Sequence, residues 1–396
     1  MQTVNVDALE RATELATRFE ARAHQHDDDA AFPSADIDDL REAGLLGLLV
    51  PERLGGLGAR FADYVDVAVV LAGGSPATAL VFNMHASVTG ALAGIPDEHA
   101  RALGVPEWAL RARDAMLQEA ADGAVYGVAI SEPQVGSRLS ALTTAYEREG
   151  DGYRLRGTKS ACSGAGHLDA YLVAARAARD PDQGVISYFL VPEGDGIVAG
   201  SGWDPLGMRA TASNALRLDV HVPSDRLVGG LEGLVLPLAW SMPQWLVASY
   251  AAVYVGVAEA AVQSGADYLR RRLDAGRNVT SSVRRRLGRA DADVQAARLV
   301  LQHAARLVDD NPGEPETNRW LYRTKLLAGD VAMSAVASVA EACGLGALSR
   351  GAPLERLFRD ARFGAIMPPA SDACADYLGA TTLGLDPVVA MEETPW

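Results

Sequence analysis

Serine hydroxyls and glycine turns gather in one stretch of the chain, residues 126–175. An apolar run breaks at Ser131-Glu132-Pro133, a Gly136-Ser137 turn follows, and Ser163 comes after a further predicted strand. Loops at strand ends present backbone N–H groups and hydroxyls as hydrogen-bond donors, which a binding site needs. Taken singly, each serine predicts only a turn or a cap, and it is their joint spacing that favours a site.

The elements that position these loops follow from the hydrophobic pattern. Apolar residues at helical spacing run through much of residues 7–122, including one expected helix from about Ala62 to Thr89. Period-two alternation predicts short strands within residues 154–223, and helical spacing then returns with an expected helix from Trp240 to Arg272. This order indicates a helical domain, a small β domain and a helical bundle.

The composition limits the class of partner. The chain has 396 residues, 49% of them apolar, with a formal net charge of −15 and a pI near 4.9. A field of that sign repels nucleic acid and anionic membranes, so we expect neither as a partner. No apolar run approaches the roughly twenty residues that span a bilayer, and no targeting segment is visible.

Cysteine and histidine usage indicates a reducing compartment and no metal. Cys162, Cys343 and Cys374 show no paired spacing and no CxxC motif, so we expect a cytoplasmic protein. His24 and His26 lie in a polar run without nearby cysteines, which favours a solvated loop over a metal site.

The Ser-Glu-Pro-x-x-Gly-Ser string and three other segments resemble the acyl-CoA dehydrogenase superfamily and follow in that family's order. The resemblance covers nearly the whole chain. It implies an α+β, mostly α, fold with an N-terminal helical domain (1–125), a central small β-barrel (126–232) and a C-terminal four-helix bundle (233–396). The other segments are FPSADIDDLREAGLLGLLVPERLGGLGA from Phe32, WDPLGMRATASNALRLDVHVP from Trp203 and PLERLFRDAR from Pro353.

The resemblance also implies FAD as the cofactor. Reduction of a flavin places negative charge near N1 and O2, so its site needs hydrogen-bond donors aimed at that edge. By resemblance, Ser163 lies near N5, Ser137 near the phosphates, and Ala161 replaces a tryptophan that usually packs by the ring. The cofactor-binding residues expected in the barrel are Ala129, Ile130, Ser131, Gly136, Ser137, Ala161, Cys162 and Ser163.

Three more cofactor residues are expected in the bundle. Arg272 matches the family's arginine that reaches the FAD pyrophosphate of the neighbouring subunit, and a guanidinium suits two phosphate oxygens. A solvated arginine at a helix end is the other interpretation. Ala340 and Gly344 match the adenine-side segment only loosely. A contact in trans implies at least a homodimer or a homotetramer.

The family's catalytic base is missing from its usual positions. A dehydrogenase of this kind removes an α proton with a carboxylate, but Pro368 occupies the usual glutamate position and Leu246 the alternative one. The remaining candidates are Asp372, which is more typical of a helix cap, Glu341, more typical of a salt bridge, and His85, more typical of a hydrogen-bonded core.

Three functions therefore stay open. The first is an FAD-dependent oxidoreductase acting on an acyl thioester of CoA or a carrier protein, with a relocated base and an electron acceptor protein or oxygen. The second is a monooxygenase or oxidase on the same fold, which needs no carboxylate there. The third is a catalytically degenerate subunit. Trp240, Trp245 and Tyr250 are candidates to line an acyl pocket, although aromatic residues at helical spacing more often form core.

Overall fold

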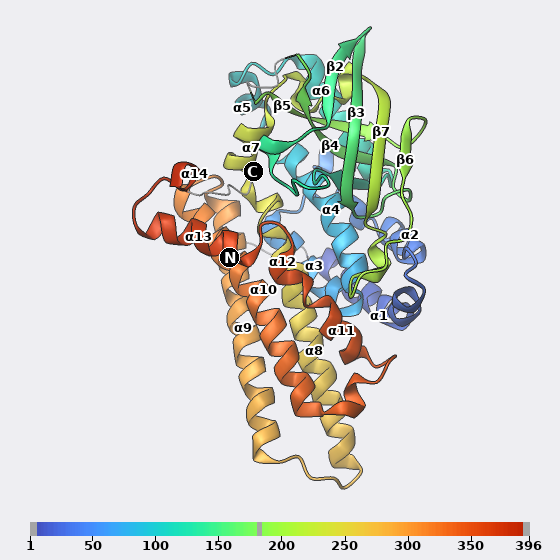
Figure 1. Cartoon of the computed structure of the whole chain (residues 1–396), viewed down its shortest axis with the longest axis vertical. Helices are drawn as coiled ribbons and strands as arrows, with labels where there is room; N and C mark the ends of the chain where they lie inside the picture. Colours follow the sequence, from blue (N-terminus) through green and yellow to red (C-terminus); the bar gives the residue numbers. More distant parts are fainter. Residues whose placement is uncertain (1–5, 180–183, 391–396) are drawn as a thin grey trace.

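The three regions of the chain occupy different parts of the molecule (Figure 1). The structure, a computed structural model, describes residues 6–179 and 184–390. The strands lie at one end, the long C-terminal helices extend to the other, and the N-terminal helices of residues 6–93 pack where the two meet (Figure 1). The predicted order of helical domain, β domain and helical bundle is confirmed, and the domain boundaries stay a prediction.

The N-terminal region is helical and departs from the sequence expectation at two points. The run around His24 is not a loop, because α1 continues through it to Asp29. The single helix expected across residues 62–89 breaks at Ser75, whose hydroxyl oxygen accepts a hydrogen bond from the Thr78 N–H (3.3 Å) and caps a new helix. The helices are α1 (Val6–Asp29), α2 (Ser34–Glu42), α3 (Phe61–Gly74), α4 (Pro76–Ala93), α5 (Asp97–Ala102) and α6 (Glu107–Ala121).

Seven strands form one curled sheet in the order β1-β4-β2-β3-β7-β6, and β5 joins it at β4. Along β5 the side chains alternate between the two faces. Ser187 and Phe189 contact Tyr146 on one face, so Tyr188 points to the other. The strands are β1 (Tyr126–Ala129), β2 (Ala145–Glu149), β3 (Gly152–Cys162), β4 (Ala170–Ala177), β5 (Ile186–Pro192), β6 (Ile197–Ala199) and β7 (Asn214–Pro223).

The C-terminal region is a bundle in which α8, α9 and α10 run side by side and α13 packs on α10. The continuous helix expected from Trp240 to Arg272 is wrong at its start. Pro243 lacks an N–H, and the chain breaks there into α7 and α8 with a 3-10 turn between them. The helices are α7 (Val235–Ser241), α8 (Ser249–Asp274), α9 (Ser281–Asp310), α10 (Pro315–Cys343), α11 (Pro353–Asp360), α12 (Phe363–Ile366), α13 (Ser371–Thr382) and α14 (Pro387–Ala390).

Two bundle segments are long and apolar enough, by length and composition alone, to cross a membrane, contrary to the expectation from the sequence. They are Pro243–Asp274 and Pro315–Cys343, and 72% and 50% of their most apolar windows are buried inside the protein. Apolar helices buried against neighbours are also what the core of a helical bundle requires.

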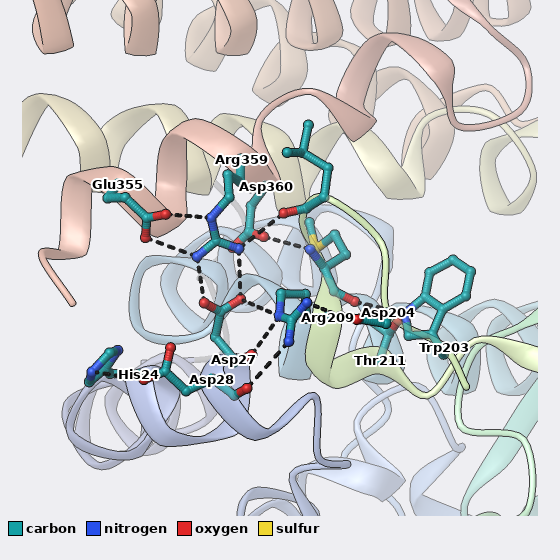
Figure 2. A network of polar contacts seen from close by, with 12 residues as sticks. His24, Asp27, Asp28, Trp203, Asp204, Arg209, Thr211, Glu355, Arg359 and Asp360 are labelled. Carbon is teal, nitrogen blue, oxygen red and sulfur yellow. Dashed lines mark hydrogen bonds and ion pairs between the residues drawn. The ribbon is translucent and has the colours of Figure 1, made fainter. Parts of the chain in front are cut away.

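A polar network joins α1, the loop before β7 and α11 (Figure 2). The Arg359 guanidinium donates to both carboxylate oxygens of Asp27 (3.0 and 2.5 Å) and to both of Glu355 (2.7 and 2.9 Å). Beside it, the buried Asp360 carboxylate accepts a hydrogen bond from the Met208 N–H at 2.6 Å. Met208 and Arg359 lie in two of the segments that resemble the family. Through this network, these segments connect the sheet to α1 and α11.

Candidate functional site

Two loops of the sheet meet at the predicted flavin wall. The Ile130 carbonyl oxygen accepts a hydrogen bond from the Lys159 ammonium at 3.2 Å, and the Ser160 N–H donates to the Ser131 carbonyl oxygen at 2.8 Å. The segment after β1 is thereby fixed to the end of β3. The predicted residues brought together here are Ala129, Ile130 and Ser131 from one loop and Ala161, Cys162 and Ser163 from the other.

A buried ion pair holds these loops. The Lys159 Nζ lies 2.8 Å from Glu132 Oε1, and the two side chains are 0% and 1% exposed. The Glu132 carboxylate also accepts hydrogen bonds from the Thr143 N–H, the Thr143 hydroxyl and the Thr144 N–H at 2.6–2.9 Å. Burial alone would raise the pKa of Glu132, but Lys159 and these donors lower it to about 2. The carboxylate therefore stays charged and structural.

A chain of three hydroxyls runs behind the same wall. The Ser163 and Ser213 hydroxyl oxygens are 2.9 Å apart, and those of Ser213 and Thr211 are 2.7 Å apart. The Thr211 hydroxyl donates to the Met208 carbonyl oxygen at 2.9 Å, which links the chain to the network of Figure 2. Ser163 is therefore held in one orientation by residues that the sequence alone did not connect to it.

The surface of the wall is open and rich in donors. Ala161 is exposed at a left-handed position (φ 52°), at a shift in the β3–β7 register. An added Cβ at Gly136 (φ 64°) would meet no atom within 4 Å. In the part of the chain that the structure describes, the Ser131 and Ser137 hydroxyls have no hydrogen-bond partner. Cys162 is buried, and burial raises the pKa of its thiol to about 12, so it is no nucleophile.

The predicted bundle residues lie far from the barrel loops within one chain. α8 has 26 residues and extends about 39 Å at ~1.5 Å per residue, with Arg272 near its far end (Figure 1). The Arg272 Nε is buried without a partner, and its guanidinium makes no ion pair with the described residues. At the end of α10, the Gly344 N–H donates to the Ala340 carbonyl oxygen at 2.9 Å. One flavin therefore cannot contact both groups of residues in a single chain.

His85 is a hydrogen-bonded core histidine. Its Nε2 lies 2.7 Å from the Leu46 carbonyl oxygen, and the Tyr126 N–H donates to its Nδ1 at 3.1 Å. The ring is 1% exposed, and burial lowers the pKa of His85 to about 4. With its proton on Nε2 and both nitrogens occupied, the neutral ring has no lone pair left for a substrate proton.

The two carboxylate candidates lie on the surface. Glu341 is exposed on α10 and its Oε2 lies 2.5 Å from the Arg286 guanidinium. Asp372 is exposed in the first turn of α13, where the helix dipole favours a carboxylate. The structure therefore brings none of Glu341, Asp372 and His85 into an apolar cavity where an acyl chain would lie.

Lys325 holds the segment that carries Pro368. Its ammonium donates to the carbonyl oxygens of Gly364 (2.9 Å) and Met367 (3.0 Å). The side chain is fully buried, and this burial lowers the pKa of Lys325 to about 8, an effect that Cys374 and Asp330 only partly offset. The sequence held a signal for this residue, since Lys159 and Lys325 are the only lysines of the chain.

An apolar cavity of about 410 Å³ lies between the sheet and helices α4 to α7. Ile130 of the predicted flavin wall lines it, and so does Leu246, which occupies the alternative base position. Among the residues that the structure describes, none that lines it is an aspartate, a glutamate or a histidine. Its one charged group, the Arg113 guanidinium, already donates to Asp97 and Asp114 at 2.6 and 2.7 Å.

Trp245 forms one wall of the cavity, whereas Tyr250 does not line it. The indole packs on α4 at Gly90, where an added Cβ would come within 2.0 Å of the ring. Its other side meets Phe61 edge-on, with ring centroids 5.0 Å apart. The break at Pro243 permits this orientation, so the unforeseen helix interruption shapes the cavity.

The donor set at the barrel loops fits a flavin. The half-buried Ser131 and Ser137 hydroxyls have no partner among the described residues, and a hydrogen-bonded serine, Ser163, stands where the resemblance puts one near N5. The Arg272 guanidinium, which makes no ion pair with the described residues, fits a phosphate but lies at the end of α8 distant from that wall.

Three family models match the chain in its own order. They are acyl-CoA dehydrogenase, N-terminal domain, at residues 9–109, the middle domain at residues 127–220 and the C-terminal domain at residues 248–367.

Relatives of two kinds are similar over almost the whole chain. The putative acyl-CoA dehydrogenase YdbM of Bacillus subtilis is 30% identical over 94% of this chain and 95% of its own length. The amino sugar nitrososynthase DnmZ of Streptomyces peucetius is 31% identical over 96% and 93%. The crystal structure of FMN-bound TdsC from Paenibacillus sp. A11-2, a dibenzothiophene monooxygenase, is 25% identical with a TM-score of 0.83, over 95% of this chain and 97% of that one.

Proposed function

Since the chain belongs to the acyl-CoA dehydrogenase family of flavin-dependent enzymes, we propose that it is a monooxygenase that acts on a largely apolar substrate. The observation that carries the proposal is the lining of the 410 Å³ cavity, whose described residues include no carboxylate and no histidine. The enzyme class of the family is established by the relatives, and the type of reaction is what we infer.

Desaturation of a thioester requires a base beside the α carbon, because that proton is too weakly acidic to leave unaided. Leu246 lines the cavity at one family position for this base, and Pro368 is exposed at the other. A bound reduced flavin would supply electrons to oxygen, and this reaction requires no carboxylate at the position of the base. The apolar walls of the cavity exclude water, and the fixed Ser163 hydroxyl orients a hydrogen bond at the wall.

The similar proteins support this reaction type. DnmZ and TdsC are named as a nitrososynthase and a monooxygenase, and both names describe the addition of oxygen. A cavity with so few polar lining groups suits an apolar ring system better than an amino sugar. The hydroxyls of an amino sugar would lose their hydrogen bonds to water and gain few from the cavity lining.

We further propose FAD, rather than FMN, and an assembly of at least two chains in the cytoplasm. Arg272 supports this, because an arginine without a described partner is suited to a pyrophosphate, a group that FMN lacks. The length of α8 supports a contact with the pyrophosphate of a neighbouring chain, because Arg272 lies near the helix end distant from the barrel loops.

A second candidate is the oxidation of an acyl thioester, with an electron acceptor protein. The same cavity would take an acyl chain, and YdbM is named as a putative acyl-CoA dehydrogenase. That function needs a base from outside the cavity lining.

An anaerobic titration separates the two candidates. Flavin-loaded protein is mixed with acyl-CoA thioesters of increasing chain length, and the absorbance of the oxidised flavin is followed. We expect no bleaching with any thioester. The same protein, supplied with reduced flavin, labelled oxygen and dibenzothiophene or indole as probes, is expected to give product that contains the label. Bleaching by a thioester without oxygen would refute the monooxygenase assignment.

A further inference from the structure

A second pocket, of about 580 Å³, lies on the bundle between α8, α9 and α11, and it shares no lining residue with the apolar cavity. Along α8 its lining runs from Glu259 to Arg271, a span of about 18 Å at ~1.5 Å per residue. Charged groups of both signs face it. They are Glu20, Glu259, Asp267, Asp291, Arg271 and Arg356.

Arg356, on α11, is a nearly buried arginine without a counter-ion. The residue is 8% exposed, and its guanidinium makes no hydrogen bond and no ion pair with the described residues. Of its side-chain nitrogens only Nε is fully enclosed, so the two terminal nitrogens keep accessible surface at a residue that lines the pocket. A ligand in the pocket can therefore reach an unpaired guanidinium.

Asp360, one turn further along α11, is not the missing counter-ion. Its carboxylate accepts the hydrogen bond from the Met208 N–H in the network of Figure 2. Burial raises the pKa of Asp360 to about 6, although the Met208 N–H and the charge of Arg356 act in the opposite direction. A buried charge without a partner is costly, so Arg356 calls for an anion that the described residues do not supply.

Glu259, on α8, is the complementary group in the same pocket. The Arg298 guanidinium lies 3.8 Å from its Oε2 without a hydrogen bond, and donates instead to Asp66 at 2.7 Å. Burial raises the pKa of Glu259, and Arg298 only partly offsets this effect. A half-buried carboxylate thus lacks a close cation in the pocket where a guanidinium lacks an anion.

We propose that this pocket binds a small zwitterion, whose carboxylate accepts hydrogen bonds from Arg356 and whose ammonium group lies against Glu259. The proposal does not rest on the proposed function, because the pocket is separate from the flavin wall and from the apolar cavity. Arg–carboxylate pairs are strong when two N–H groups donate together, and both terminal nitrogens of Arg356 are available for this.

The charges of the lining exclude other ligand classes. A polyanion would meet four carboxylates against two guanidiniums. A simple amine would leave Arg356 unpaired, and a simple acid would leave Glu259 without a cation. An apolar molecule would remove water from both groups and replace none of their hydrogen bonds.

ω-Amino acids of increasing length test the proposal, because the two groups stand at a fixed separation. β-Alanine, γ-aminobutyrate and ε-aminohexanoate are titrated into flavin-loaded protein by calorimetry, each beside the unsubstituted acid and the amine of equal chain length. We expect one of the three to bind about tenfold more tightly than its acid and its amine, the gain from one further hydrogen bond to a charged group. Absence of binding, or equal binding of zwitterion, acid and amine, overturns the proposal.

Two variants separate the two contacts. Arg356→Met should weaken the bound ω-amino acid about tenfold and leave the amine unchanged, and Glu259→Gln should weaken it similarly and leave the acid unchanged. Arg289→Met is the matched control, because it removes an exposed arginine of α9 that is paired with Asp293 outside the pocket. A loss in the control as large as in Arg356→Met, or no loss in either pocket variant, contradicts the assignment.

Thermal melting and sedimentation check that the anion comes from a free molecule. Without ligand, Arg356→Met should melt at or above the wild-type temperature, because it removes an unpaired buried charge. A clear drop would show that Arg356 has a partner within the protein and would overturn the proposal. Arg356→Met should also keep the wild-type assembly, and dissociation would assign the anion to a neighbouring chain and refute a small-molecule site.

Discussion

Lys159 and Lys325, the chain's two lysines, are both fully buried and anchor opposite sides of the candidate site. Lys159, on the sheet side, forms an ion pair with Glu132, whose oxygens are saturated by four donors. Lys325, on the bundle side, only donates to two backbone carbonyl oxygens. Arginine serves at every other basic position, and a compact ammonium suits these two enclosed places better than a planar guanidinium.

The difference between the two lysines separates cofactor binding, on the sheet side, from acid–base chemistry, on the bundle side. On the sheet side, charge is balanced and the loops carry the donors expected for a flavin. On the bundle side, the resemblance puts Pro368 where the family has its base, and the anchoring Lys325 ammonium contacts two backbone carbonyl oxygens, while the nearby Asp330 raises its pKa without forming an ion pair with it. If the resemblance holds at Pro368, the chain keeps the loops that hold a flavin but has no carboxylate at the position where the family removes an α proton.

Breaking the ion pair on the sheet side should have the largest effect. Glu132→Gln leaves the Lys159 ammonium buried without its counter-charge, so we expect unfolding to become easier by about 3–5 kcal/mol. Chemical denaturation measures this free energy. The double variant Glu132→Gln with Lys159→Met should recover part of the loss, and equal losses in single and double variants would contradict the ion-pair account.

The bundle side should respond to pH instead. Lys325 has a folded pKa of about 8 against 10.5 in the unfolded chain, so between these values the unfolded state binds more protons and stability rises with pH. The contribution reaches up to about 3 kcal/mol above pH 10.5, and it is absent below pH 8. Measured between pH 7 and 10, the stability of wild type relative to Lys325→Met should increase. A constant difference would show that the ammonium titrates normally.

The smallest effect concerns the far end of α8. Arg272→Gln should weaken FAD about tenfold, equivalent to about 1.4 kcal/mol, and leave FMN unchanged, because only FAD presents a pyrophosphate. Flavin fluorescence gives both affinities. Arg270→Gln removes an exposed arginine paired with Asp267 on the same helix and should change neither. Equal losses for FAD and FMN in Arg272→Gln would contradict a phosphate contact in trans.

Sequence patterns predicted the order of the elements and the loops that carry Ser131 and Ser163, because turn residues and hydrophobic periodicity are local properties. They also favoured a core role for His85 and a surface role for Glu341 and Asp372, which is how the structure places these side chains. They missed the break at Pro243, the hydroxyl chain through Ser213 and the burial of Lys325, each of which depends on segments distant in the chain.

By itself, the sequence determined the family-like scaffold, and by resemblance it predicted that Pro368 and Leu246 stand where the family has a carboxylate. Only the tertiary structure decided that no acidic side chain among the described residues lines the cavity. A carboxylate from any helix could have reached that space. Whether one does depends on packing between elements, and local sequence does not encode it.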